Sequence, residues 1–194
     1  MPWVKDFDVD TALDQAMGVF WAKGYEAASL SDLIAAMKIN KGSLYNAFGS
    51  KKALFVRAVL KYDRDGRQAS LAKLALLDDP QAAIAALFDG MIAESGDDVA
   101  RKGCLLVNTA LEMPNHEPDI RELIAASLAD FEAFLERTIR QGQDRGQFRV
   151  ALDPRVSAKS LLAQVVGFRV LARGVYGPDD LQAIRDAALK QLAA

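Results

Sequence analysis

The sequence predicts an all-α protein, with an N-terminal three-helix domain of the helix-turn-helix type and a C-terminal helical domain. Apolar residues recur at spacings of three and four along one segment after another. An acidic residue precedes proline at Asp79-Pro80 and Asp153-Pro154, and such a pair marks the first turn of a helix. No segment shows the alternation that is typical of a strand.

Three short helices are expected at the start of the chain. The first ends at Lys23-Gly24, where glycine suits a left-handed helix stop. Ser29 and Asp32 form a capping box that opens the second helix, and Asn40 can cap a third. The apolar stripe of the first helix, which supplies core for the other two, comprises Leu13, Ala16, Met17 and Phe20.

The third of these helices has one apolar and one polar face. Leu44 and Phe48, four residues apart, place the apolar face. A helix of this size fits the major groove of DNA, where exposed donors and acceptors can contact base edges. The polar face carries Lys41, Ser43, Tyr45 and Asn46, so we expect it to read DNA.

The following helix opens at Gly49-Ser50 with two lysines, Lys51 and Lys52. A lysine in the first turn is repelled by the positive end of the helix dipole and lowers helix stability by roughly a few tenths of a kcal/mol. A bound phosphate would turn this repulsion into a net attraction. Free N–H groups beside a lysine make a seat for an anion, and Tyr45 can add a phenolic donor. We therefore expect a phosphate contact here.

The segment from Leu13 to Leu54 resembles the DNA-binding domain of the TetR family of bacterial transcriptional regulators. FWAKGYEAASLSDLIAAMKINKGSLYNAFGSKKALF is similar to the family pattern F-x-x-x-G-[FY]…[ST]-[LIV]…Y-x-x-F-x-[SN]-K-x-x-L. The resemblance implies a homodimer, a palindromic operator on double-stranded DNA and a separate domain that senses a small-molecule effector. The residues predicted to contact DNA are Ser29, Lys38, Lys41, Gly42, Ser43, Tyr45, Asn46 and Lys51.

Three features depart from the family pattern. Lys38 stands at the joint where the family usually has glycine, and a left-handed conformation would cost this residue about 1 kcal/mol. Ala47 has no polar group where relatives often have an aromatic residue or histidine, which leaves fewer groups for base edges. The arm VKDFDVD has Lys5 as its only cation, which argues against a minor-groove contact by this arm.

Composition and charge narrow the class of protein. The chain of 194 residues is 51% hydrophobic, which is enough for a real core in one large or two small domains. A net charge of -2 argues against coating nucleic acid by charge alone. Between Met37 and Arg64, however, Asp63 is the single acid among seven basic residues, a local patch that fits site-specific binding. These are Lys38, Lys41, Lys51, Lys52, Arg57, Lys61 and Arg64.

Other signals concern compartment and cofactors. The first residues, MPWVKDF, lack the pattern of an export signal, and no apolar run approaches the ~20 residues of a membrane span. The single cysteine cannot form an internal disulfide, so we expect a cytoplasmic protein. Because His116 has no second histidine or cysteine partner at suitable spacing, we expect a structural or solvated role for it, with no metal and no cofactor.

We expect three functional segments: a DNA-binding domain (1–52), a connecting helix (53–77) and an effector-binding and dimerisation domain (78–194). The helix after Asp153-Pro154 is apolar around most of its circumference, so it needs a second subunit as cover. The small residues Ala163 and Gly167, four positions apart, would allow the helices of two subunits to approach each other closely there. Together with the last helix, it would form a four-helix dimer seam.

Cys104 is the candidate for redox sensing. It follows Gly103 near a predicted helix start, with Arg101 and Lys102 adjacent, and these features favour the thiolate. Asn108 lies one helical turn further on. The run GCLLVNTALE also resembles a subgroup of the family with a Gly-Cys pair, some members of which sense electrophiles. The alternative is that the cysteine is a small buried hydrophobe.

Apolar candidates for an effector pocket are Phe88, Met91, Phe131, Phe134 and Phe168. Aromatic residues at helical spacing are also typical of plain core. Arg169 and Arg173 could pair with an acidic ligand, with Asp or Glu, or with the rim of an interface.

The expected function is a ligand- or redox-responsive DNA-binding regulator of transcription, acting as a repressor. One alternative is an all-helical enzyme with Cys104 as nucleophile, which would need a base within reach and would leave the basic patch unexplained. A second is a dimeric DNA-binding module with no effector.

Overall fold

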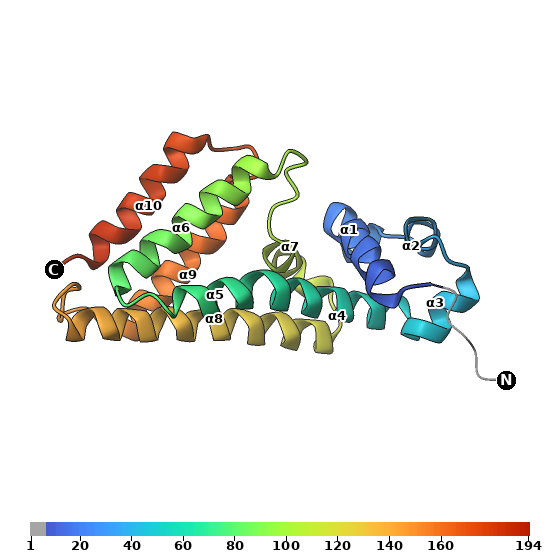
Figure 1. Cartoon of the computed structure of the whole chain (residues 1–194), viewed down its shortest axis with the longest axis horizontal. Coiled ribbons are helices and arrows are strands. Elements are labelled where there is room, and N and C mark those ends of the chain that lie inside the picture. The colour runs from blue at the N-terminus through green and yellow to red at the C-terminus, as the bar shows by residue number, and fades with distance from the viewer. Residues whose placement is uncertain (1–6) are drawn as a thin grey trace. The chain divides into compact units, whose positions relative to one another are not determined.

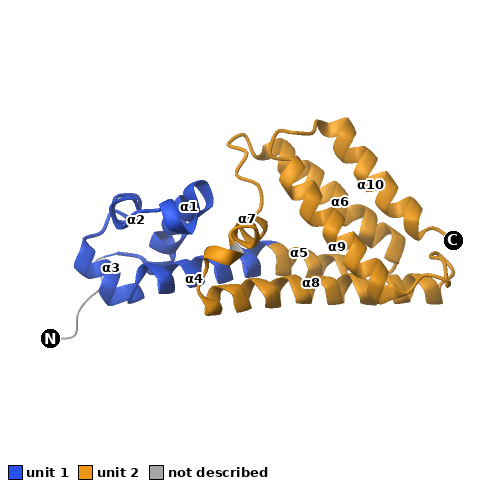
Figure 2. Ribbon diagram, turned by 180° about the vertical axis from the view of Figure 1, so that it is seen from behind, with its two compact units in different colours: residues 1–66 blue, residues 67–194 orange. Residues whose placement is uncertain are grey.

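The computed structural model describes residues 7–194, and within this range it is built from helices. The predicted all-α class is confirmed. The chain divides into two compact units, the first ending at Gly66 and the second beginning at Arg67 (Figure 2). The predictions for Lys5 and for the first residues of the chain lie outside the described residues.

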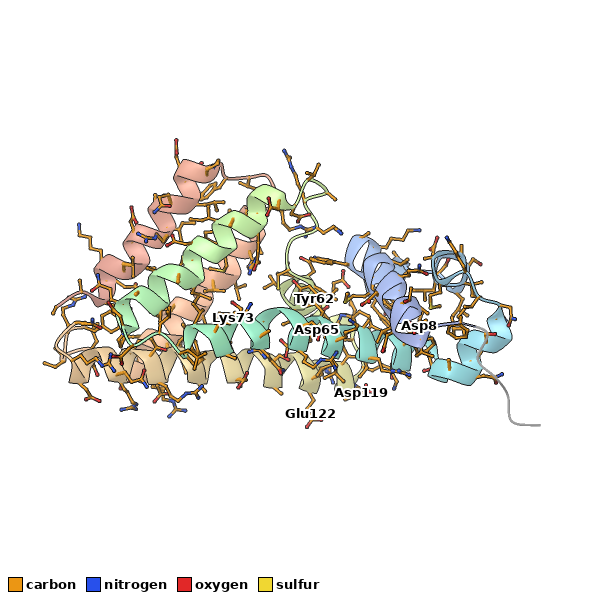
Figure 3. All side chains as sticks on the ribbon, viewed as in Figure 1. Asp8, Tyr62, Asp65, Lys73, Asp119 and Glu122 are labelled. Atoms are coloured by element: carbon orange, nitrogen blue, oxygen red, sulfur yellow. The ribbon has the colours of Figure 1, made fainter. Side chains whose placement is uncertain are left out.

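The first unit contains α1 (Val9–Ala27), α2 (Leu30–Met37), α3 (Lys41–Phe48) and α4 (Lys51–Tyr62) (Figure 1). Helix α1 packs against both α2 and α4. Its first turn is capped by Asp8, whose carboxylate accepts a hydrogen bond from Thr11 N at 2.6 Å (Figure 3). The core of this unit comprises Leu13, Ala16, Phe20, Leu33, Met37, Leu44, Phe48, Leu54, Phe55 and Val59.

The C-terminal part of α1 is joined to α4 by aromatic contacts. Gly24 has the expected positive φ, 78°, and its backbone is not helical, so Val9–Ala27 consists of two helical stretches that meet at a kink and the first ends at the predicted glycine. The Phe55 ring lies 5.0 Å from Phe20 and 4.8 Å from Tyr25, measured between centroids. The Trp21 and Tyr62 rings meet edge to face, with centroids 4.9 Å apart.

The segment expected to be one connecting helix is divided into three parts. Helix α4 ends at Tyr62, a π-helix covers Asp63–Gln68, and α5 covers Ala69–Leu74. The hydrogen bonds of a π-helix span one residue more than those of an α-helix, and Gly66, a poor α-helix former, lies within this π-helix. The boundary between the two compact units lies in this π-helix.

The second unit continues with α6 (Pro80–Asp97), α7 (Leu105–Leu111), a 3-10 turn (Met113–Asn115), α8 (Pro118–Asp144), α9 (Pro154–Leu171) and α10 (Pro178–Leu192). The expected cap-then-proline starts are present. The Asp79 carboxylate accepts from the N–H groups of Ala82 and Gln81 and from Gln147 Nε2, and the Ala82 bond, followed by that from Gln147, lowers the pKa of this carboxyl. Asp153 caps α9 in the same way.

The core of the second unit is formed by α5, α6, α8, α9 and α10. Helix α8 packs against α6, α7 and α9, while α10 packs against α6 and α9 (Figure 1). After α8 the chain turns at Gly146, and Phe148 pairs with Ala193 in an antiparallel bridge. No helix within residues 7–194 has the length and apolar character that a bilayer crossing requires.

Candidate nucleic-acid interface

The start of α2 is held by a capping box. Ser29 Oγ accepts from Asp32 N at 3.0 Å and donates to Asp32 Oδ2 at 2.8 Å, and the same carboxylate oxygen accepts from Ser29 N. Lys23 Nζ lies 2.7 Å from Asp32 Oδ1. The Lys23 hydrogen bond, followed by those from Ser29, lowers the pKa of Asp32 to about 2. Ser29, a predicted DNA contact, therefore also forms the cap of α2.

The joint between α2 and α3 is left-handed. Lys38 has φ 54° and ψ 39°, and its N–H donates to Ala35 O. A residue with a Cβ pays roughly 1–2 kcal/mol for this conformation. The Lys38 side chain is exposed, so its positive charge lies on the surface of this turn.

Helix α3 presents the polar face that its sequence predicts. The Asn40 side chain caps it by accepting from Ser43 N at 2.8 Å, and Leu44 and Phe48 are buried. A Cβ on Gly42 would lie 3.3 Å from Asn40 Oδ1, so glycine leaves room for the cap. Lys41, Gly42, Tyr45 and Asn46 are exposed, whereas Ser43 and Ala47 are half-buried.

The lysine at the start of α4 has partners that its sequence context does not indicate. Ser50 caps α4 by accepting from Ala53 N at 3.0 Å. Lys51 Nζ lies 4.7 Å from the centroid of the Tyr25 ring and 3.3 Å from Glu26 O. The ammonium group thus lies against the end of α1, and a phosphate would have to share it with these partners.

Arg57 is a residue that sequence reasoning placed only in the general basic patch. Its Nη1 donates to Ala47 O at 3.2 Å, and its Cζ lies 4.9 Å from the centroid of the Phe48 ring. Both partners belong to the last turn of α3. The sequence carries no signal for this tie, because it joins two helices across a turn.

The apolar effector candidates lie together in the second unit. Phe88 and Met91 on α6, Phe131 and Phe134 on α8, and Phe168 on α9 belong to one buried cluster with exposures of 0 to 7%. The Phe88 and Phe168 rings meet edge to face at 6.0 Å.

Cys104 and Asn108 lie outside that cluster. Cys104 is the N-cap residue of α7 and is half-buried, so the expected helix start is confirmed. Asn108 Nδ2 donates to Lys102 O at 2.8 Å, and its Oδ1 accepts from Arg173 Nη1 at 3.2 Å. Arg173 Nε also donates to Arg101 O. The Asn108 amide therefore ties the loop before α7 to the end of α9.

The remaining polar candidates have structural surroundings. His116 is 4% exposed, so the solvated alternative is wrong; its Nε2 lies 3.8 Å from Glu112 Oε2. Arg169 pairs with Glu94 at 2.6 Å, which is one of the three roles expected for it. Among residues 7–194, no group of three or more His, Cys, Asp or Glu side chains is placed to hold a metal ion.

Comparisons with known proteins agree with this arrangement. The family model for bacterial regulatory proteins of the tetR family matches residues 12–58, and that for the tetracyclin repressor-like C-terminal domain matches residues 80–188. The chain is 31% identical over 189 residues to the HTH-type transcriptional repressor ComR of Escherichia coli K12, covering 96% of this chain and 89% of that protein. It is 29% identical over 143 residues to the HTH-type transcriptional regulator YezE of Bacillus subtilis 168, covering 74% of each.

Solved structures give the same result. A cysteine-substituted form of the TetR family regulator CifR, complexed with 26-base-pair operator DNA, superposes with a TM-score of 0.85 at 31% identity over 97% of this chain and 98% of that one. A TetR family regulator from Agrobacterium tumefaciens, at 22% identity, shares the fold with a TM-score of 0.86 over 95% and 97%.

A capped helix with an exposed polar face, joined to a separate helical unit, defines a helix-turn-helix DNA-binding regulator of transcription. The chain belongs to the TetR family of bacterial regulatory proteins. The enzyme alternative built on Cys104 is set aside, because this family consists of DNA-binding regulators.

Proposed function

We propose that this protein is a homodimeric transcriptional repressor that binds a palindromic operator through α3 and leaves it when an effector binds the second unit. The observation that carries the proposal is the exposed polar face of α3, which is capped at Asn40 and anchored by buried Leu44 and Phe48. Operator binding by CifR and the repressor activity of ComR support it. Like other bacterial regulators of transcription, it would work in the cytoplasm.

We divide the functions along the chain as residues 1–52 for DNA binding, 53–77 for the connection, and 78–194 for effector binding and dimerisation. In the first segment, Lys41 and Asn46 would contact base edges, since both are exposed on α3. Tyr45 and Lys51 would contact phosphates. Ser29, Lys38, Gly42 and Ser43 would line the same surface.

Selection of bound duplexes from a random pool tests this function. A homodimer should select a palindrome whose half-sites are centred about 34–36 Å apart, one turn of DNA. Lys41→Ala and Asn46→Ala should then change which bases are preferred, whereas Tyr45→Phe should weaken binding to every duplex. Recovery of no common sequence would contradict the proposal.

The effector would act on the cluster around Phe88 and Phe168, or on the thiol of Cys104. A ligand shifts the protein only as far as it prefers one conformation over the other. Cys104→Ser should keep operator affinity but abolish release by oxidants or electrophiles. Release that survives this substitution would exclude the thiol and leave the apolar cluster as the candidate.

The nearly complete burial of that cluster favours a second candidate, a dimeric DNA-binding module without an effector. Thermal-shift screening of small apolar and acidic compounds separates the two. A compound that raises the melting temperature and also releases DNA supports sensing. Compounds that release DNA without raising the melting temperature would not support sensing.

A further inference from the structure

The last turn of α3 needs partners from outside the helix. An α-helix leaves its final carbonyl groups without partners of its own. In α3, Tyr45 O accepts from Gly49 N at 2.9 Å, and Ala47 O accepts from the guanidinium of Arg57 at 3.2 Å. Arg57 therefore supplies from α4 a donor that α3 itself lacks.

The same guanidinium also lies over the ring that anchors α3. Phe48 is 5% exposed, and its ring centroid lies 4.9 Å from Arg57 Cζ. The face of an aromatic ring attracts a cation. The carbonyl end of a helix also attracts a cation, because it is the negative end of the helix dipole. One side chain thus holds the backbone and the anchoring ring of a single turn.

The Arg57 contacts lie at the C-terminal turn of α3, where neighbouring residues of the chain do little to fix the direction of the helix. Helix α3 has eight residues, and Gly49 follows it at φ 80° before α4 begins. Its N-terminal end is held by the Asn40 cap and by the joint at Lys38. The tilt of the C-terminal end, and with it the direction of Tyr45 and Asn46, depends on contacts with α4.

We propose that Arg57 is a positioning residue for sequence recognition: it holds the C-terminal turn of α3 at the angle that operator bases require, without itself contacting DNA. The inference rests on the proposed operator binding, to which it adds a residue outside the reading face. Recognition groups need support to within about 0.5 Å of their productive geometry, so loss of this tie should reduce discrimination more than general affinity.

The test uses the full-length protein with Arg57→Ala, Arg57→Gln and the control Arg64→Ala. Glutamine loses the charge but keeps an N–H donor. Arg64→Ala removes the same charge from a guanidinium that pairs with Asp65 at 2.7 Å. Affinities for the selected operator and for a scrambled duplex of equal length are measured by fluorescence anisotropy over a series of salt concentrations.

Arg57→Ala should weaken operator binding roughly fivefold to tenfold, as expected for the loss of one solvent-exposed hydrogen bond of ordinary net strength. The affinity of Arg57→Ala for the scrambled duplex and its salt dependence should match those of Arg64→Ala. Arg57→Gln keeps a donor but loses the charge over Phe48, so it should recover only part of the operator affinity. Equal weakening on both duplexes, with a salt slope smaller by about one, would make Arg57 a phosphate contact and overturn the proposal. Unchanged operator affinity would overturn it as well.

Amide hydrogen exchange of the DNA-free protein separates this inference from the proposed function. Exchange at Gly49 N–H, which closes the last turn of α3, should rise in Arg57→Ala and return towards wild type in Arg57→Gln. Unchanged exchange would refute the tie, whatever the protein binds. Failure of the wild type to distinguish operator from scrambled DNA would instead refute the proposed function.

Discussion

Gly142→Ala should destabilise the second unit, although alanine is the better helix former. Gly142 lies near the end of α8, and a Cβ there would lie 2.1 Å from Phe148 Cδ2 and 2.4 Å from Cε2. Both atoms belong to the rigid Phe148 ring, which is 1% exposed and therefore has no room to move aside. The ring would have to leave its site.

Two opposing free energies decide whether Gly142→Ala stabilises or destabilises the protein. Glycine to alanine within a helix gains about 1 kcal/mol, whereas removing a buried phenylalanine from its site costs about 3–5 kcal/mol. We therefore expect a net loss of about 2–4 kcal/mol in the free energy of unfolding. The displaced ring would also strain the pairing of Phe148 with Ala193 and the hydrogen bond from Arg149 N to Leu192 O.

Chemical denaturation measures this loss, at one fixed protein concentration because dimerisation adds to apparent stability. Gly90→Ala is the matched control: it lies within α6, nothing is within 4 Å of its Cβ position, and it should stabilise by roughly 0.5–1 kcal/mol. In a Phe148→Ala background, Gly142→Ala should become neutral or stabilising. If Gly142→Ala and Gly90→Ala were equally stable, the steric argument would be wrong.

Three further predictions concern the joint, the cap and the dimer. Lys38→Gly should raise the free energy of unfolding by up to about 1 kcal/mol, because glycine relieves the left-handed strain; a lower denaturation midpoint would contradict this. The folded-state pKa of Asp32 is about 2 against an ordinary 3.8, so its contribution is complete above 3.8 and is lost as the pH falls through about 2. Asp32→Asn should therefore flatten the acid dependence of stability in that interval, and an unchanged profile would exclude the cap as its cause. Gly167→Leu should weaken dimerisation by about fivefold or more if α9 lies in the seam, because overpacking costs about 1–3 kcal/mol; sedimentation at decreasing concentration measures it, and an unchanged dimer would place the seam elsewhere.

Much of the fold could be predicted because its signals are local. Asp79 and Asp153 cap helices within three residues of themselves, and Ser29 and Asp32 form their box across a single turn. The exposed face of α3 follows from the helical period once Leu44 and Phe48 are buried. The left-handed geometry of Lys38 was expected only because relatives place glycine there.

Other features depend on residues that are not neighbours on one helix face. The π-helix at Asp63–Gln68 inserts into a segment whose apolar spacing suggested one α-helix. Lys51 meets Glu26 from 25 positions away, and Arg57 meets Ala47 from 10. Apolar periodicity indicates which face of a helix is buried but not which polar atoms of another helix lie opposite.

The sequence by itself determined the all-α class, the polar face of α3 and the starts of α2, α3, α4, α6, α7 and α9, because helix caps and amphipathic periods act within a few residues. Tertiary structure alone decided that Arg57 and Lys51 lie against neighbouring helices, that Asn108 ties a loop to α9, and that Gly142 makes room for Phe148. The physical reason is range: capping bonds and helical periods join residues a turn or two apart, whereas these contacts form only after helices have packed.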